Sequence, residues 1–222
     1  MMLEVQHISK RRKFRKVLQD CSFVIETGKI IGIIGENGSG KTTLLKVLAG
    51  ILRANQGTIN LENDRSQQIS YSPDQSYFYD YFSIEELIEF YQSQYPDFNQ
   101  ERANALIKFF TLNRKEKIKY LSKGQLGRVK IAVTIAREAP FLVLDEPLAG
   151  LDPLVKEKII KGIIQFIDLE SQSLIITTHE LLEVEPILDE VIVMKNGTII
   201  EQKQVEQIRE ETTIQDWLEQ IY

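Results

Sequence analysis

A glycine-rich stretch, "GENGSGKT", directly follows a run of apolar residues and precedes a helical pattern. It fits G-x-x-x-x-G-K-[ST], in which glycines let the backbone curl so that its N–H groups point inward at an anion. Lys41 would bring a positive charge to the β and γ phosphates, and the Thr42 hydroxyl would be a ligand of Mg²⁺. The pattern predicts a phosphate loop whose candidate binding residues are Gly35, Glu36, Asn37, Gly38, Ser39, Gly40, Lys41, Thr42 and Thr43.

Two adjacent acids, Asp145 and Glu146, end the apolar run "FLVL". If that run is a buried strand, both carboxylates lie at the carboxyl edge of the sheet, where open α/β sheets bind their ligands. Carboxylates are costly to bury without a cation, so Asp145 is the predicted partner of Mg²⁺. Glu146 is placed to orient or deprotonate an attacking water, which favours hydrolysis of a phosphoanhydride over transfer to a bulky acceptor.

Two further polar positions extend this chemistry. His179 follows the apolar run "SLIITT" and is predicted to reach the same sheet edge, where an imidazole could hydrogen-bond the terminal phosphate or the water. The stretch "LSKGQ" places a serine and a glycine at another helix start, far along the chain from the phosphate loop. Its N–H groups and helix dipole predict a second anion site, and its serine is also an ordinary N-cap. The candidates in this stretch are Leu121, Ser122, Lys123, Gly124 and Gln125.

Apolar periodicity predicts the elements that must hold these residues. The runs "LEVQHI", "VLQDCSFVI" and "KIIGIIG" are predicted strands, and a helix follows that ends near Gly50 or Arg53. "GTINL" and "QISYS" are predicted short strands. Helical spacing begins near Ser83, the predicted N-cap, and covers two helices, which indicates an inserted all-helical block.

The second half of the chain alternates helices and strands. A helix starts at Ser122, a strand is "FLVL", a helix runs from Pro153 to Leu169, and "SLIITT" is another strand. A short helix and a hairpin that turns at Asn196-Gly197 follow. The last twenty or so residues carry an apolar stripe that favours core packing over a partner site. Alternation of this kind predicts an α/β fold with a mostly parallel sheet.

Composition and charge restrict the class of protein. With 222 residues, 43% of them hydrophobic, the chain fits one globular domain. Its apolar runs are too short to cross a bilayer and its start has no secretory h-region, so a cytoplasmic protein is predicted. A net charge of −5 argues against a general nucleic-acid binder. The basic run from Lys10 to Lys16 is predicted as a solvated hairpin, with a phosphate or membrane-surface patch as the alternative.

The order of "GENGSGKT", "LSKGQ", "FLVLDEP", "LAGLD" and "TTHE" resembles that in the nucleotide-binding subunits of ATP-binding cassette transporters over essentially the whole length. The resemblance implies a RecA-like P-loop NTPase core with a mostly parallel sheet, an antiparallel β portion and an inserted helical subdomain. Residues 1–222 would form one ATPase domain, with 1–82 and 126–222 as the catalytic core and about 83–125 as the helical subdomain. ATP and Mg²⁺ are the implied cofactors. The stretches "LSKGQ" and "LDEPLAGLDP" are more similar to those in cassettes of exporters than to those in cassettes of nutrient importers.

The same resemblance implies an active site shared by two chains. In that family the signature motif, here residues 121–125, meets the γ-phosphate held by the phosphate loop of the opposite subunit. The D-loop, here "LAGLD", runs between subunits and would bring Asp152 near the opposing phosphate loop. A homodimer and a heterodimer with a paralogous cassette both fit.

Three positions depart from the family pattern or match it loosely. Lys123 stands where the common signature has glycine, and it would reach phosphate or face solvent. The Q-loop glutamine usually follows the proline of "YSPDQ", where this chain has Asp74; its role in Mg²⁺ binding, catalysis and coupling falls to Gln75, with Asp74 as the alternative. Phe14 is the best candidate to stack on adenine, with Arg11 and Arg12 as alternatives.

The implied function is that of an ATPase subunit that energises a separate transmembrane permease. The subunit would bind the permease at the inner face of the cell membrane, and the permease would export drugs, peptides or lipids. The aromatic run "YFYDYF" before the helical block would receive the permease or would fix that block to the sheet. No nucleic-acid partner is expected. The alternative function is a soluble cassette ATPase that acts on ribosomes or DNA.

Overall fold

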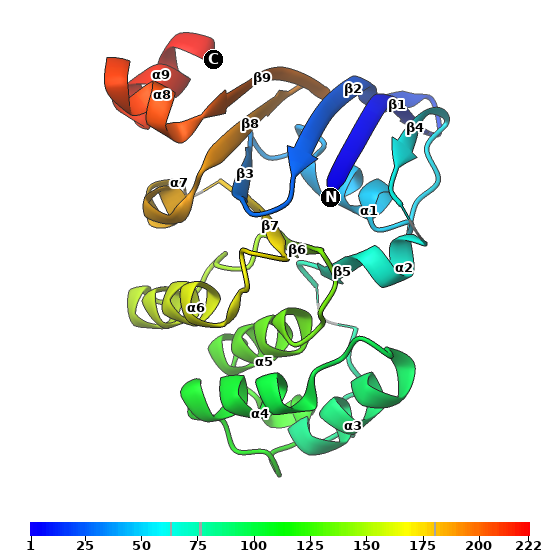
Figure 1. Cartoon of the computed structure of the whole chain (residues 1–222), viewed down its shortest axis with the longest axis vertical. Helices are drawn as coiled ribbons and strands as arrows, with labels where there is room; N and C mark the ends of the chain where they lie inside the picture. The colour runs from blue at the N-terminus through cyan, green and yellow to red at the C-terminus, as the bar shows by residue number, and fades with distance from the viewer. Residues whose placement is uncertain (63, 76, 180) are drawn as a thin grey trace.

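The computed structural model describes residues 1–62, 64–75, 77–179 and 181–222. The strands form two sheets, one with the order β2-β1-β4 and one with the order β5-β6-β7-β3-β8-β9 (Figure 1). Their bounds are β1 (Met2–Arg12), β2 (Arg15–Glu26), β3 (Ile30–Ile34), β4 (Gln56–Asn60), β5 (Ile69–Ser72), β6 (Phe141–Asp145), β7 (Ser173–Thr178), β8 (Glu190–Lys195) and β9 (Thr198–Gln204).

The larger sheet is parallel from β5 to β8, and β9 pairs antiparallel with β8. Strand β3 shows why its apolar run lies at the centre. Ile30 and Ile34 face one hydrophobic core, whereas Ile31 and Ile33 face the other, because successive side chains of a strand alternate. The smaller sheet is antiparallel. The predicted fold class, a mostly parallel sheet with an antiparallel portion, is confirmed.

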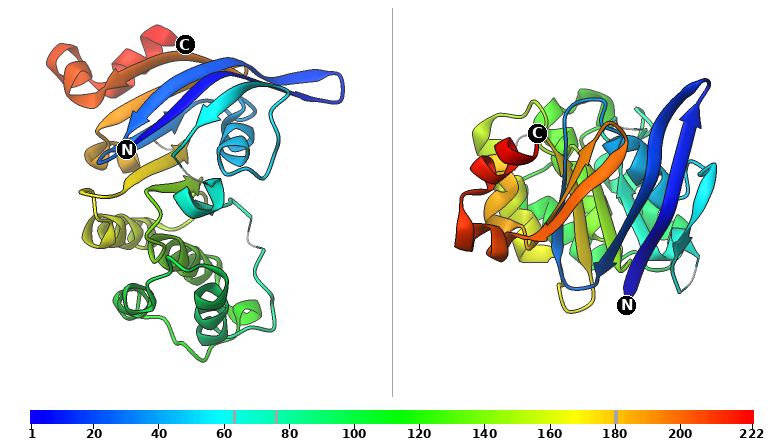
Figure 2. Two further views of the ribbon diagram at one scale, coloured as in Figure 1. Left: turned by 45° about the vertical axis from the view of Figure 1, so that its right-hand side comes forward. Right: turned by 90° about the horizontal axis from the view of Figure 1, so that it is seen from above.

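Helices cover both faces of the parallel sheet. α1 packs between the two sheets with its leucines in a core that it shares with β1, β2 and β3, and α5 and α6 line the opposite face (Figure 2). The short helix α2 was not expected from the sequence. The helices are α1 (Lys41–Leu48), α2 (Arg65–Gln68), α3 (Ile84–Gln94), α4 (Gln100–Phe109), η1 (Ile118–Tyr120), α5 (Lys123–Ile135), α6 (Pro153–Phe166), α7 (Leu181–Val184), η2 (Glu185–Ile187), α8 (Val205–Glu211) and α9 (Ile214–Ile221).

α3 and α4 lie at the end of the molecule away from the antiparallel sheet, next to α5 (Figure 1). Ser83 caps α3, as predicted, and forms a capping box with Glu86. Beyond α5, the buried Arg137 binds the carboxylate of Asp97 with both Nε and Nη2, at 2.8 Å each, and its guanidinium lies 4.0 Å from the centre of the Tyr95 ring. This pair fixes the α3–α4 loop to the α/β part. The division into a core and a helical subdomain stays a prediction.

The C-terminal segment packs on the body of the protein. Ile208, Ile214 and Trp217 are buried in the core that α5 and α6 share, so the predicted core packing of this stripe is confirmed. The hairpin between β8 and β9 turns at Asn196 and Gly197, both with positive φ, as the Asn-Gly pair predicts. Among the residues that the structure describes, no helix is long and apolar enough to cross a membrane.

Candidate nucleotide-binding site

The phosphate loop connects the buried strand β3 to α1. Gly38 and Gly40 have φ values of 84° and 110°, a region that L-residues with a side chain rarely adopt. At Gly35 the constraint is space, because an added Cβ would collide with the carbonyl oxygen of Met194. These glycines therefore permit the curled backbone and the free helix start that an anion needs.

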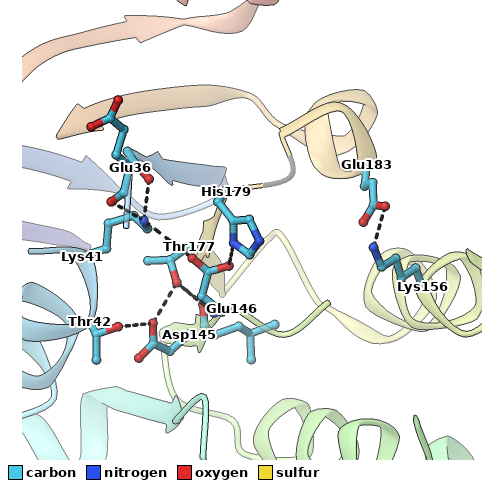
Figure 3. A network of polar contacts seen from close by, with 11 residues as sticks. Glu36, Lys41, Thr42, Asp145, Glu146, Lys156, Thr177, His179 and Glu183 are labelled. Atoms are coloured by element: carbon cyan, nitrogen blue, oxygen red, sulfur yellow. Dashed lines mark hydrogen bonds and ion pairs between the residues drawn. The ribbon is translucent and has the colours of Figure 1, made fainter. Parts of the chain in front are cut away.

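Lys41 points from the start of α1 back into this loop (Figure 3). Its side chain is only 6% exposed, and its Nζ donates to the carbonyl oxygens of Gly35 at 2.6 Å and Glu36 at 3.2 Å. The same ammonium lies 3.6 Å from Oε1 of Glu146. The Lys41 ammonium is thus held between the phosphate loop and the carboxylate of Glu146, the predicted catalytic base. A terminal phosphate bound there would lie next to the ammonium and the carboxylate.

Asp145 ends β6 with its carboxylate almost fully buried and surrounded by hydroxyl groups. Oδ1 accepts hydrogen bonds from Thr42 Oγ1 and Thr177 Oγ1, both at 3.0 Å. Oδ2 accepts from the Tyr71 hydroxyl at 3.1 Å. Burial, and next the charge of Asp145, raises the pKa of Tyr71 well above its usual range, so this hydroxyl stays protonated and donates.

This set of oxygens fits Mg²⁺, which prefers few protein ligands and takes phosphate and water oxygens for the rest. The Thr42 hydroxyl and the Asp145 carboxylate already lie within hydrogen-bond distance of each other at the sheet edge. Within the described ranges, no group of three or more His, Cys, Asp or Glu side chains could hold a metal. The Thr42 and Asp145 oxygens leave room around such a metal for phosphate and water oxygens.

Glu146 has an unusual backbone and two supports. Its φ is 47°, in the left-handed region, a strain of about 1–2 kcal/mol for a residue with a side chain. The backbone N–H donates to Thr177 Oγ1 at 2.9 Å, and Oε2 lies 2.8 Å from Nδ1 of His179 (Figure 3). The structure thus brings the predicted base and the predicted histidine into direct contact.

Thr177 is a site residue that the sequence reasoning missed. One hydroxyl accepts from the Glu146 backbone and donates to the Asp145 carboxylate, so it fixes the two acids relative to each other. Thr177 belongs to β7, which pairs with β6 at this register. The available signal was its place two residues before His179 at the end of a buried strand.

We expect Thr177→Val to keep ATP binding and to lower turnover by about tenfold or more, since two buried hydrogen bonds at the acids are lost. Thr134→Val, which removes the buried hydroxyl that bonds to Lys130 inside α5, is the matched control and should hydrolyse ATP near the wild-type rate. Turnover under saturating ATP measures the effect. Equal rates in both variants would exclude this role of Thr177.

A cavity of about 410 Å³ opens over the phosphate loop. The predicted residues Asn37, Gly38, Gly40, Lys41, Thr42, Thr43, Asp74, Glu146 and His179 line it, together with Val17 and Ala149. Residues from the phosphate loop, the end of β6 and the end of β7 therefore meet in one space. Its described lining carries the Lys41 ammonium and the carboxylates of Asp74 and Glu146.

The Q-loop reaches this cavity through Asp74. Gln75 is exposed and does not belong to the described lining. Lys130 of α5 donates to the carbonyl oxygen of Asp74 at 2.7 Å and holds the loop backbone. Of the two residues expected to fill the Q-loop role, Asp74 therefore belongs to the described lining and Gln75 does not.

Phe14 lies away from the cavity. It occupies the tip of the β1–β2 hairpin with its side chain fully exposed, and within the described lining this hairpin contributes Val17 instead. Arg12 lines a second, larger cavity beside Thr42 and Thr43. Of the candidates for a contact with the base, Arg12 thus belongs to the described lining of a cavity next to the phosphate loop, and Phe14 does not. The run Arg11–Lys16 is exposed throughout, as expected of a solvated hairpin.

The signature stretch begins α5 outside the described lining of the cavity. Ser122 caps α5 and forms a capping box with Gln125, so the predicted N-cap is confirmed. A Cβ on Gly150 would come within 2.5 Å of Lys123 Nζ, which places this ammonium against the D-loop of its own chain. Asp152 caps α6 through the N–H of Val155. Ser122 and Asp152 are both exposed, and neither belongs to the described lining of the cavity.

The sequence of the chain is similar to those of known proteins. The sequence model of the family described as "ABC transporter" matches residues 18–149. "ABC transporter ATP-binding protein YtrB" of Bacillus subtilis is 28% identical over 217 residues, which cover 95% of this chain and 74% of that protein. "Lipopolysaccharide export system ATP-binding protein LptB" of Haemophilus influenzae is 30% identical over 223 residues, which cover 93% of this chain and 92% of that protein.

Solved structures show the same fold. The ATP-binding subunit of an ABC transporter matches over 100% of this chain and 99% of its own, with a TM-score of 0.89 at 23% identity. The ATP-binding cassette MJ0796, as a dimer in a post-hydrolysis state bound to ADP and Pi, matches over 91% and 98% with a TM-score of 0.81 at 21% identity.

A phosphate loop between β3 and α1, with acids at the end of a nearby parallel strand, defines a P-loop NTPase. The chain belongs to the ABC transporter family, as the sequence resemblance implied. It is an ATP-binding ATPase of that family.

Proposed function

We propose that two cassettes close on two ATP molecules and that hydrolysis reopens them to drive a separate transmembrane permease. The observation that carries this proposal is the position of the signature helix start. α5 begins after Ser122 as a helix N-terminus, whose dipole attracts anions, yet this start lies outside the described lining of the cavity that holds the phosphate loop of the same chain. A second cassette supplies the missing half, and the dimeric cassette among the similar structures supports this.

Within each site, the loop amides and Lys41 bind the β and γ phosphates. Glu146 accepts a proton from the attacking water while the water oxygen forms a bond to the γ-phosphorus. The bond between the γ-phosphorus and the β–γ bridging oxygen breaks, and ADP and phosphate leave. His179 holds the Glu146 carboxylate at 2.8 Å and lies where the terminal phosphate would arrive.

Mg²⁺ would be held by Thr42 and Asp145, with Asp74 near the same space. When bound, it neutralises charge on the β and γ phosphates. Thr177 and the strained backbone of Glu146 keep the two carboxylates apart, so that one is left for the metal and the other for water. One carboxylate for the metal and one for the attacking water are the groups that hydrolysis needs.

The permease and the direction of transport complete the proposal. A cassette of this family acts on the inner face of the membrane through its permease, and we favour export of a drug, peptide or lipid. The form of "LSKGQ" and "LDEPLAGLDP" supports export, as does the similarity to the ATP-binding protein of a lipopolysaccharide export system. Fold alone does not fix the transported molecule.

Copurification from membranes in mild detergent tests the partner. The expected result is a defined complex with a protein that spans the membrane several times, in which ATP turnover rises relative to the isolated chain. A Lys41→Ala chain should form the same complex without turnover. Sedimentation with ribosomes or DNA, and no membrane complex, would contradict the proposal.

A further inference from the structure

Tyr71 lies between the nucleotide site and the second cavity, which share Val17, Thr42 and Thr43 in their linings. It lies in β5, next to the Q-loop, and its hydroxyl reaches Asp145 of β6 across the parallel pair. Its ring lines the second cavity, of about 720 Å³, whose wall includes the aromatic residues Tyr77, Phe78, Tyr79, Phe90, Tyr91 and Tyr95. The hydroxyl therefore belongs to the nucleotide site and the ring to the aromatic cavity.

The bond matters because of which oxygen it holds. Oδ1 of Asp145 accepts hydrogen bonds from Thr42 and Thr177, whereas Oδ2 accepts one from the Tyr71 hydroxyl. Rotation of the carboxylate about the Cβ–Cγ bond would move both oxygens, so the donor on Oδ2 adds a restraint to the two on Oδ1 and fixes the second oxygen as well. A hydrogen bond to a buried charged group is among the stronger ones in proteins.

We infer that Tyr71 is a positioning residue for Asp145, which sets the orientation in which this carboxylate receives Mg²⁺. The inference rests on the proposed function, in which Asp145 holds the metal. Tyr71 does not touch the nucleotide in this role. It acts through Asp145, so its loss weakens the dependence of nucleotide binding on metal and leaves metal-free binding unchanged.

Tyr71→Phe removes the hydroxyl and keeps the ring. We expect it to need roughly tenfold more Mg²⁺ for half-maximal binding of a fluorescent ATP analogue, since a charged hydrogen bond of this kind is worth about one order of magnitude in an equilibrium. Binding in EDTA and the melting temperature should match the wild type. Tyr71→Met, which also lacks the hydroxyl, must show the same shift and covers the case in which the first variant does not fold.

Tyr91→Phe is the matched control, because Tyr91 lines the same cavity, is half-buried and has ring contacts with Phe78 and Phe98. It should titrate with Mg²⁺ as the wild type does. A Tyr71→Phe curve that overlies the wild type would overturn the inference. An Asp145→Asn variant separates the role of Tyr71 from the role of Asp145 as the metal ligand. If this variant binds the analogue with unchanged Mg²⁺ dependence, Asp145 is no metal ligand, and the proposed function of the site is wrong whatever Tyr71 does.

Discussion

Glu146→Gln is expected to bind ATP with wild-type affinity and to hydrolyse it at least about 100-fold more slowly, which is the usual contribution of a general base. The amide keeps the size of the side chain and its place between Lys41 and His179. It cannot accept the proton of water, so the bound nucleotide persists. The closed, ATP-bound dimer should therefore accumulate.

Two measurements check this result together: phosphate release under saturating ATP, and the dimer fraction in size-exclusion chromatography with ATP present. Glu157→Gln, on the exposed face of α6 with Lys161 as its partner, is the control and should behave as the wild type. Turnover of Glu146→Gln near the wild-type rate would show that another group activates the water.

Ser122→Arg is expected to abolish turnover, to below about 1% of wild type, while each chain still binds ATP. The bulk and charge of arginine at the start of α5 would keep the opposite nucleotide from reaching the helix N-terminus. The substitution also removes an N-cap, which costs about 1 kcal/mol of stability. The functional loss must be separated from that cost.

Ser83→Arg provides the separation, because Ser83 caps α3 in the same kind of capping box but lies outside the signature. Both variants should lose similar thermal stability, and Ser83→Arg should retain most of the turnover. ATP binding to the monomer, by fluorescence, should be the same in both. If Ser122→Arg hydrolyses ATP as Ser83→Arg does, the signature helix start has no part in catalysis.

Local patterns predicted the parts of the fold and site that depend on neighbouring residues. The phosphate loop needs glycine, lysine and threonine at fixed spacing, and "FLVLDEP" ends a strand with acids. Each motif is a short contiguous stretch, so each could be recognised from the sequence alone. Ser83 and Ser122 were found as helix caps by the same logic. The parallel sheet followed from alternating strands and helices.

Contacts across strands could not be predicted in this way. Tyr71 reaches Asp145 over 74 positions of sequence, and Thr177 reaches it over 32, so each depends on the register of a neighbouring strand. Phe14 was chosen for its ring, but the hairpin places it at an exposed tip. The positions of Asp74 and Gln75 likewise depend on a contact that is distant in sequence, because Lys130 of α5 donates to the carbonyl oxygen of Asp74.

Lys123 illustrates the same limit. The sequence left its ammonium either on a phosphate or in water, and the structure places it against Gly150 of the D-loop in the same chain. Gly124 and Gly127 of α5 lie close to Val155 and Leu151, so the start of α5 packs on the D-loop and the first turn of α6. A long side chain at the third signature position therefore has a place within its own subunit.

The central claim is that each active site combines the phosphate loop of one chain with the signature of another. Mixing Lys41→Ala with Ser122→Arg tests it most directly, because each variant alone has no intact site. Equal amounts should recover about one quarter of wild-type turnover per chain, since half the dimers are mixed and each has one complete site of two. No recovery in the mixture, or full activity of either variant alone, would contradict a shared site.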